Sequence, residues 1–416
     1  MKQLLCSALT IGIATSLVAG NGKEPWRDPT VSSINRLPAR AIAVPCENAE
    51  KALAVAKGEA DVSVSKWILS LDGEWDFQWK ANVYDKDFAK KGKITVPGCW
   101  QLQGDYDPPV YTNTRYPIFG YKEGDPMTEP PKHFTSYKFR NPVGLYTRTF
   151  TIPADWKNRR VVVHFNGVSS AMYLRINGKE VGYGEDSRLP SEYDVTPFLK
   201  DGANEIAVEV IKHCDGSFLE DQDFWRLSGI FRSVWLVAEE KGAAKDLIVE
   251  TKLADDLKSG SVVIRDENGK AVLEKIYPSV KLWDAATPNM YYETVKTGSD
   301  FRTVSFGFRK IEIKNSVVYV NGRRILVKGV NRHEMEPETG YTVSVAGMKK
   351  DAAILHDLNV NAVRTCHYPD DWRWYGLCDR EGFYVCCEAN VEAHGVDDFY
   401  GKNEQYLPKK DREEHV

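Results

Sequence analysis

The sequence predicts a multidomain chain in which β-sandwiches come first and the first part of a (β/α)₈ TIM barrel comes last. Short stretches that alternate apolar and polar residues recur up to Lys314, which is typical of half-buried strands. After Asn315, strand-like and helix-like stretches alternate, as they do in parallel βαβ units. The 416 residues are sufficient for two or three globular domains.

Residues 61–240 contain many short predicted strands separated by polar turns. Trp75, Phe77 and Trp79 alternate with polar residues, which is the period-two pattern of a strand with one buried face. Asn177-Gly178 lies between two further apolar stretches and suits a type I′ hairpin turn. We expect this region to form a jelly-roll β-sandwich.

Two other regions flank this predicted sandwich. Residues 21–60 lack sustained periodicity and are predicted to form an arm that lies on the adjoining domain. Residues 241–314 predict a second β unit, in which Ser305 to Ile313 reads as one strand. This unit is short for an immunoglobulin-like domain of about 100 residues, so we expect a shortened immunoglobulin-like sandwich.

Residues 315–416 carry the predicted α/β units. Asp371 to Glu381 reads as a helix, with Gly382 as its C-terminal cap. Phe383 to Cys387 is a continuous apolar run, which predicts a strand buried on both faces. A (β/α)₈ barrel has eight units and about 250 residues, whereas only three units fit here. We therefore expect an incomplete barrel.

The first twenty residues predict a signal peptide. Lys2 is followed by an uncharged apolar stretch from Leu4 to Val18 and by the small residues Ala19 and Gly20. We expect secretion or export to the periplasm. No other stretch is long and apolar enough to span a membrane.

Charge and cysteine usage narrow the function classes. The net charge of -4 arises from interleaved signs, so the sequence lacks the basic stripe of a nucleic-acid-binding protein. The cysteines that would remain after signal cleavage are odd in number and match no disulfide framework, so we expect free thiols rather than disulfides or metal ligands. These are Cys46, Cys99, Cys214, Cys366, Cys378, Cys386 and Cys387.

Several motifs resemble those of glycoside hydrolase family two. Asn361 to Pro369, continued by Trp374-Tyr375 and Phe383-Tyr384, is similar to the signature of that family. Further segments resemble its β-galactosidase branch, namely Tyr111 to Pro117, Asp215 to Arg226, Gly329 to Glu334 and Glu388 to Gly395. The resemblance covers nearly the whole chain after the arm. It implies a sugar-binding-like jelly roll, an immunoglobulin-like sandwich and a barrel that carries the active site.

Glu392 and His394 are candidate metal ligands. They stand two residues apart after the third predicted barrel strand, so their side chains share one face, at the end of a barrel where active sites lie. The resemblance implies that they bind Mg²⁺ together with a catalytic glutamate. Histidine is an unusual ligand for this hard cation, and the alternative is a hydrogen-bonded pair at a strand end.

Four more residues are candidate sugar contacts. The resemblance implies that His333 and His367, after the first and second barrel strands, hold sugar hydroxyls and support the transition state. It also implies that Asn113 contacts the sugar and that Asp223 binds Na⁺ and a sugar hydroxyl. The alternatives are structural histidines and turn-stabilising polar residues. Asn113 and Asp223 can reach the site only if the jelly roll packs on the barrel mouth.

Retaining glycosidases use an acid/base and a nucleophilic carboxylate about 5–5.5 Å apart. The resemblance places them after the fourth and seventh barrel strands, and no glutamate of this sequence fits either role. We therefore expect an inactive fragment of a β-galactosidase that acts on terminal β-galactosides such as lactose. The alternatives are a non-catalytic carbohydrate-binding or complementing fragment, or a related β-glucuronidase or β-mannosidase. Similar enzymes are often homo-oligomers, and no nucleic-acid or membrane partner is expected.

Overall fold

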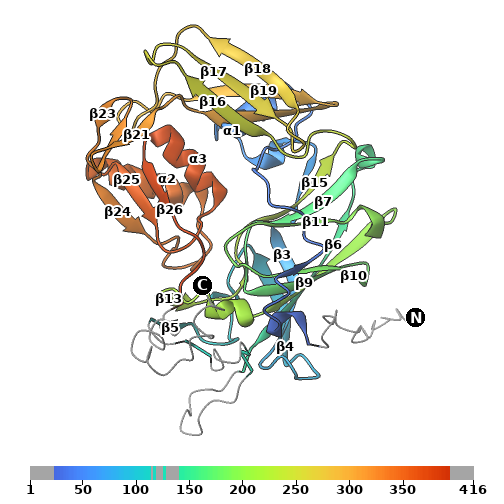
Figure 1. Cartoon of the computed structure of the whole chain (residues 1–416). Coiled ribbons are helices and arrows are strands. Elements are labelled where there is room, and N and C mark those ends of the chain that lie inside the picture. The colour runs from blue at the N-terminus through green and yellow to red at the C-terminus, as the bar shows by residue number, and fades with distance from the viewer. Residues whose placement is uncertain (1–22, 114–115, 119–124, 128–139, 394–416) are drawn as a thin grey trace.

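A computed structural model describes residues 23–113, 116–118, 125–127 and 140–393. Figure 1 shows three lobes: a large β-sandwich, a smaller β unit and an α/β unit. The predicted signal peptide lies outside the described residues and stays a prediction. Among the described helices, none is both long and apolar enough to cross a membrane.

The large lobe is a sandwich of two antiparallel sheets. Seven strands form one sheet, in the spatial order β1 (Ser33–Ile34), β10 (Lys179–Gly184), β9 (Ala171–Ile176), β12 (Ala203–Ile211), β6 (Val143–Thr151), β3 (Gly73–Lys80) and β4 (Lys90–Val96). Four strands form the other, in the order β11 (Ser191–Asp194), β7 (Arg160–Phe165), β15 (Val234–Glu239) and β2 (Ile68–Ser70). Two short ladders join β5 (Val110–Thr112) to β13 (Phe224–Arg226) and β8 (Val168–Ser169) to β14 (Gly229–Ile230).

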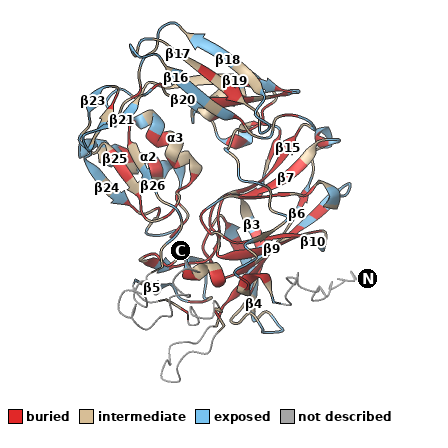
Figure 2. Ribbon diagram, in the orientation of Figure 1, coloured by how far each residue is buried: buried red, intermediate tan, exposed pale blue. Residues whose placement is uncertain are grey.

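The alternation of residues along β3 sets its orientation. Trp75, Phe77 and Trp79 are at most 2% exposed and belong to the core between the two sheets. Buried residues therefore concentrate inside this lobe, as Figure 2 shows. Asn177 and Gly178 connect β9 to β10 with φ values of 51° and 75°, the positive values that a type I′ turn requires. The predicted strand and hairpin are confirmed.

The predicted arm contains a helix that the sequence pattern did not reveal. Helix α1 (Ala49–Ala56) begins after Asn48, whose side chain accepts a hydrogen bond from the Lys51 amide at 2.9 Å. Ala52 and Val55 pack into a small core with residues of β2 and β15. The helix has eight residues, so its apolar stripe is too short to show a clear period.

The smaller β unit has a three-stranded sheet and a two-stranded sheet around one core. The first consists of β16 (Ile248–Leu253), β17 (Gly260–Arg265) and β18 (Ala271–Tyr277), and the second of β19 (Tyr291–Thr297) and β20 (Asp300–Phe306). The prediction of one strand over Ser305 to Ile313 is wrong. At Gly307 an added Cβ would come 2.8 Å from the Trp283 side chain, and the chain then leaves β19 to form a bridge between Phe308 and Leu282.

The last lobe begins with a hairpin and continues as a parallel sheet. The hairpin sheet comprises β21 (Ile311–Lys314), β22 (Val317–Val320) and β23 (Arg323–Arg324). Three parallel strands come next, β24 (Gly329–Arg332), β25 (Ala362–Thr365) and β26 (Tyr384–Cys387). Helix α2 (Val345–Asp357) connects the first pair, and α3 (Trp372–Glu381) connects the second. These are three consecutive strands of a TIM barrel.

Two features of this lobe test the sequence patterns directly. Helix α3 begins after Asp371 and ends at Gly382, whose φ is 82°, so its predicted limits are confirmed. The expectation that Phe383 to Cys387 is buried on both faces is wrong, because Cys386 and Cys387 are exposed. Strand β26 lies at the edge of the described sheet and has a neighbour on one side only.

Candidate functional site

The large β-sandwich, hereafter the jelly roll, packs against the carboxyl ends of the parallel strands. Phe224 and Phe231 of the jelly roll share a buried cluster with Tyr341 and Tyr368 of the α/β lobe. Arg188, which is 2% exposed, inserts its guanidinium between these rings, 4.0 Å from the Tyr341 centroid and 3.9 Å from that of Tyr368. Cation–π contacts of this kind are strongest when water is excluded. The jelly roll can therefore contribute residues to a site at the barrel mouth.

A buried ion pair crosses the same interface. Arg232 of the jelly roll pairs with Glu334, the residue after His333, and also donates to the Pro369 carbonyl at 2.9 Å. The second Glu334 oxygen accepts from the Asp371 amide at 2.7 Å. The pair therefore fixes the two turns that come after β24 and β25.

His333 and His367 occupy those two turns and meet edge to face. Their ring centroids are 5.6 Å apart, with the rings at 81° to each other. Nδ1 of His333 lies 3.2 Å from the Tyr368 hydroxyl. Burial lowers the pKa of His333, and the neighbouring His367 and Arg188 act in the same direction, whereas Asp223 opposes them. The Tyr368 hydroxyl orients the ring through Nδ1.

Glu388 orients His367 from the end of the third strand. One Glu388 oxygen lies 3.1 Å from Nδ1 of His367, and the other accepts from Nε of Arg364 at 2.6 Å. Burial alone would raise the pKa of Glu388, but the hydrogen bonds from Arg364 and His367 outweigh it and hold the pKa below its ordinary value. Sequence reasoning assigned no role to Glu388, although a glutamate that directly follows a barrel strand is a usable signal.

Asn113 and Asp223 flank two paired strands of the jelly roll. Thr112 of β5 pairs with Phe224 of β13 in an antiparallel register, so Asn113 follows β5 and Asp223 precedes β13 at the same end of this ladder. Gln222, fully buried, donates to Asn390 Oδ1 at 3.0 Å and approaches the His367 carbonyl at 3.5 Å. The segment that carries Asp223 therefore contacts the barrel mouth, as the predicted sugar-binding role requires.

Glu392 lies where the jelly roll meets the chain beyond β26. Its amide donates to the Leu219 carbonyl at 2.7 Å, and its carbonyl accepts from the Asp221 amide at 2.9 Å. Glu392 is half-buried, and its neighbour Val391 is 64% exposed. The other predicted metal ligand, His394, lies outside the described residues. The backbone of the predicted metal site is thus anchored to the jelly roll at Glu392.

The potential metal ligands do not all gather at Glu392. In the part of the chain that the structure describes, the groups of three close ligands are His333 with Cys366 and His367, and Glu185 with Cys214 and Asp215. Neither group includes Glu392 or Asp223. Carboxylate and amide oxygens are nevertheless the donors that Mg²⁺ and similar hard cations prefer, so Glu392, Asp223 and Asn113 suit the predicted ions chemically.

Arg332 makes structural contacts with residues of the α/β lobe. Its guanidinium pairs with Asp370 at 2.8 Å and with Asp351 at 2.9 Å, and it stacks 4.0 Å from the Trp374 ring. Arg332 therefore joins helices α2 and α3 to the end of β24.

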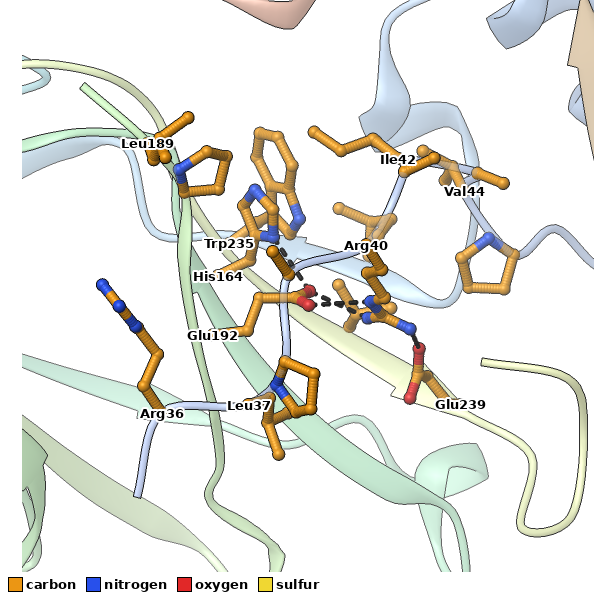
Figure 3. Close-up of a pocket in the computed structure, with 18 of the residues that line it drawn as sticks. Arg36, Leu37, Arg40, Ile42, Val44, His164, Leu189, Glu192, Trp235 and Glu239 are labelled. Carbon is orange, nitrogen blue, oxygen red and sulfur yellow. Dashed lines mark hydrogen bonds and ion pairs between the residues drawn. The ribbon is translucent and has the colours of Figure 1, made fainter. Parts of the chain in front are cut away.

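A cavity of about 430 Å³ lies elsewhere, between the arm and the four-stranded sheet of the jelly roll. Figure 3 shows His164 stacked on Trp235, with Glu192 held by Arg40. The ring centroids of that stack are 4.6 Å apart, and both ring nitrogens of His164 have hydrogen-bonding partners. None of the predicted site residues lines this cavity.

Models of one protein family match both of the lobes that form the candidate site. Residues 68–240 match the sugar binding domain of glycosyl hydrolases family 2, and residues 311–415 match the TIM barrel domain of the same family. The chain belongs to glycosyl hydrolase family 2. This membership confirms the sugar-binding sandwich and the partial TIM barrel expected from the sequence.

Curated proteins similar to this chain include β-galactosidases. The chain is 36% identical over 441 residues to the β-galactosidase of Priestia megaterium and 36% identical over 450 residues to that of Leuconostoc mesenteroides. These alignments cover 92% and 95% of this chain but 41% of each relative. The chain thus spans about two fifths of the length of the curated relatives it matches.

Solved family 2 structures share the fold. A β-glucuronidase from an uncultured Clostridium species superposes with a TM-score of 0.62 at 24% identity, over 78% of this chain and 59% of that one. The Ruminococcus gnavus β-glucuronidase gives a TM-score of 0.62 at 21% identity, over 78% and 58%. At this identity the likeness concerns the fold and does not decide between sugars.

Proposed function

We propose that the protein containing this chain is a β-galactosidase that hydrolyses terminal β-D-galactosides, such as lactose, with retention. The single observation that carries the proposal is the meeting of His333 and His367 with the Asp223 segment at one barrel mouth. The names of the 36% identical relatives favour galactoside among the sugars of family 2.

The site residues have separable roles in this proposal. Nδ1 of His333 faces the Tyr368 hydroxyl and Nδ1 of His367 faces Glu388, so each imidazole has its Nε2 left for a sugar hydroxyl. The Asp223 carboxylate and the Asn113 amide bind neighbouring hydroxyls of the same sugar. Hydrogen bonds to sugar hydroxyls that strengthen in the transition state contribute several kcal/mol to catalysis by glycosidases.

Two cations belong to the proposal. Glu392 and His394 would hold Mg²⁺, and Asp223 would hold Na⁺ beside Asn113. Bound Mg²⁺ would supply positive charge beside the reacting sugar. The chain's own contribution is to fix the Glu392 backbone through Leu219 and Asp221.

Residues 1–416 alone are proposed not to turn over substrate. Retaining hydrolysis requires a proton donor and a carboxylate nucleophile. The glutamates described at this mouth have other tasks, because Glu334 pairs with Arg232 and Glu388 pairs with Arg364. We further propose export through the predicted signal peptide, and homo-oligomerisation of the whole protein.

The second candidate function is β-glucuronidase, the activity named for two of the solved structures that share the fold. A glucuronide carries a carboxylate, so its site would require a positive charge facing the sugar. Arg364 and Arg232 are each already paired with a glutamate. We therefore place galactoside first, and a non-catalytic sugar-binding or complementing role after both.

The experiment uses the protein expressed from its natural reading frame and a chromogenic β-galactoside. Asp223→Asn should lower kcat/KM by about 100-fold or more, because transition-state contacts worth several kcal/mol weaken. Asp255→Asn is the matched control, since Asp255 is exposed in the small β unit and should leave the rate unchanged. Equal rates for both variants would contradict the proposed role of Asp223.

A further inference from the structure

A group of nitrogen and sulfur ligands lies at the barrel mouth and includes both histidines of the proposed sugar site. His333, Cys366 and His367 each offer one donor atom, and these three atoms lie within 4.8 Å of one another. The Cys366 amide donates to the Arg332 carbonyl at 3.1 Å. That bond ties the turn after β25 to the end of β24, so the three side chains come together through two neighbouring strands.

The histidines are oriented in the way that metal-binding histidines usually are. A ligating imidazole almost always uses its second ring nitrogen for a hydrogen bond to a carboxylate or another polar group, which fixes the ring and raises its basicity. Here Nδ1 of His367 lies 3.1 Å from Glu388, and Nδ1 of His333 lies 3.2 Å from the Tyr368 hydroxyl. On each ring Nδ1 therefore has a polar partner, and in His367 this atom also faces the Arg364 guanidinium at 3.1 Å. An ion would bind at Nε2 of each ring.

The donor set selects a particular class of metal. Two imidazoles and one thiolate match Zn²⁺ and similar borderline-soft ions, whereas Mg²⁺ and Na⁺ prefer oxygen. Zn–N bonds of about 2.0–2.1 Å and Zn–S bonds of about 2.3 Å bring tetrahedral ligands to about 3.5 Å from one another. The three donors, which lie within 4.8 Å of one another, need to close by no more than about 1.3 Å around such an ion. Three protein ligands leave the fourth position to water.

The surrounding charges permit a divalent cation together with a thiolate. Arg364 faces His367 and is balanced by its ion pair with Glu388. Around His333, the Arg188 guanidinium and the Asp223 carboxylate act with opposite sign. Cys366 is 2% exposed, whereas both histidines are half-buried. An ion would therefore enter past the imidazoles and displace the thiol proton to solvent as it binds.

We propose that His333, Cys366 and His367 form a site for Zn²⁺ or a similar borderline-soft divalent ion, separate in ligands and in metal class from the oxygen-rich site at Glu392. An ion held there would occupy the imidazoles assigned to the sugar and so inhibit hydrolysis. That consequence rests on the proposed function. The metal site itself does not, so its test can fail while the β-galactosidase proposal stands.

The test uses Co²⁺ as a spectroscopic probe for Zn²⁺ in the purified 416-residue chain. We expect one equivalent of Co²⁺ to give a near-ultraviolet thiolate charge-transfer band and the visible bands of tetrahedral cobalt, and Zn²⁺ to abolish both. Cys366→Ser should remove the charge-transfer band. Cys387→Ser is the matched control, because Cys387 is an exposed thiol at the end of the neighbouring strand, and it should leave the spectrum unchanged.

Several results would overturn the assignment of this metal site. The absence of a thiolate band in the parent chain, its retention in Cys366→Ser, or its loss in Cys387→Ser would each exclude the site. His367→Asn provides a second variant that keeps the thiol. It should weaken Co²⁺ binding by at least tenfold, and unchanged binding would exclude His367 as a ligand.

Discussion

His333 and His367 lie edge to face at the barrel mouth, with ring centroids 5.6 Å apart. They follow the neighbouring parallel strands β24 and β25. Nδ1 of His333 contacts the Tyr368 hydroxyl, and Nδ1 of His367 contacts Glu388. The pair thus has the fixed orientation that a sugar-binding or a metal-binding site needs.

Removal of the Glu388 charge should loosen this pair. Glu388→Gln should weaken Co²⁺ binding by about 10–100-fold, the usual effect of losing a hydrogen-bonding partner of a ligating histidine. Isothermal titration would measure it. Glu381→Gln is the control, because it changes an exposed histidine–glutamate pair with His356. Equal affinities of both variants would mean that Glu388 does not support His367.

The ion pair between Arg232 and Glu334 should dominate the stability of the domain interface. Arg232→Met should reduce the free energy of unfolding by about 3–5 kcal/mol, because it leaves Glu334 buried without a partner. Lys93→Met, which alters an exposed pair with Asp76, should leave the free energy of unfolding nearly unchanged. Urea unfolding would compare them. A loss for Arg232→Met as small as that of the control would contradict this view.

Much of the fold could be predicted from local patterns. The alternation at Trp75 and Phe77, the Asn177-Gly178 turn and the Asp371 cap each act within a few residues, and the structure confirms them. The split strand at Gly307 was missed because its cause, the approach of Trp283, comes from elsewhere in the chain.

The site could be predicted only in part from the sequence. The positions of His333 and His367 could be inferred from motifs at strand ends. Their supports could not, since Glu388 meets His367 across neighbouring strands and Arg188 arrives from another domain. Tertiary contacts of this kind leave no periodic signal.

The Glu192 carboxylate beneath the arm should make stability depend on pH (Figure 3). Burial alone would raise its pKa, but hydrogen bonds from His164 and Arg40 outweigh it and lower the pKa to about 2. A carboxylate with a lowered pKa stabilises the fold above its unfolded pKa of about 4.3, and this contribution is lost as the pH falls towards 2.

Glu192→Gln should therefore cost about 3 kcal/mol at neutral pH and close to nothing at pH 2. Denaturant unfolding at several pH values would measure the difference from the parent chain. Glu250→Gln, in an exposed pair with Arg265, should show no such dependence. A cost that does not change with pH would contradict the role assigned to the Glu192 charge.

The described thiols should differ strongly in reactivity. Cys386 and Cys387 are exposed on β26 and should be alkylated first. Burial raises the pKa of Cys46 to about 11 and that of Cys99 to about 12, so both should react only after unfolding. Mass spectrometry of peptides after timed alkylation would rank them. Early modification of Cys99 would show that the interface between the lobes opens.

The most direct test of the central claim is the ratio of kcat/KM for a chromogenic β-galactoside to that for the matching β-glucuronide, measured on the protein expressed from its natural reading frame. We predict a ratio of at least about 100, because contacts from Asp223 and the two histidines worth several kcal/mol would be specific to the galactoside. A ratio below one would contradict the β-galactosidase proposal and assign the chain to the glucuronidase branch of family 2.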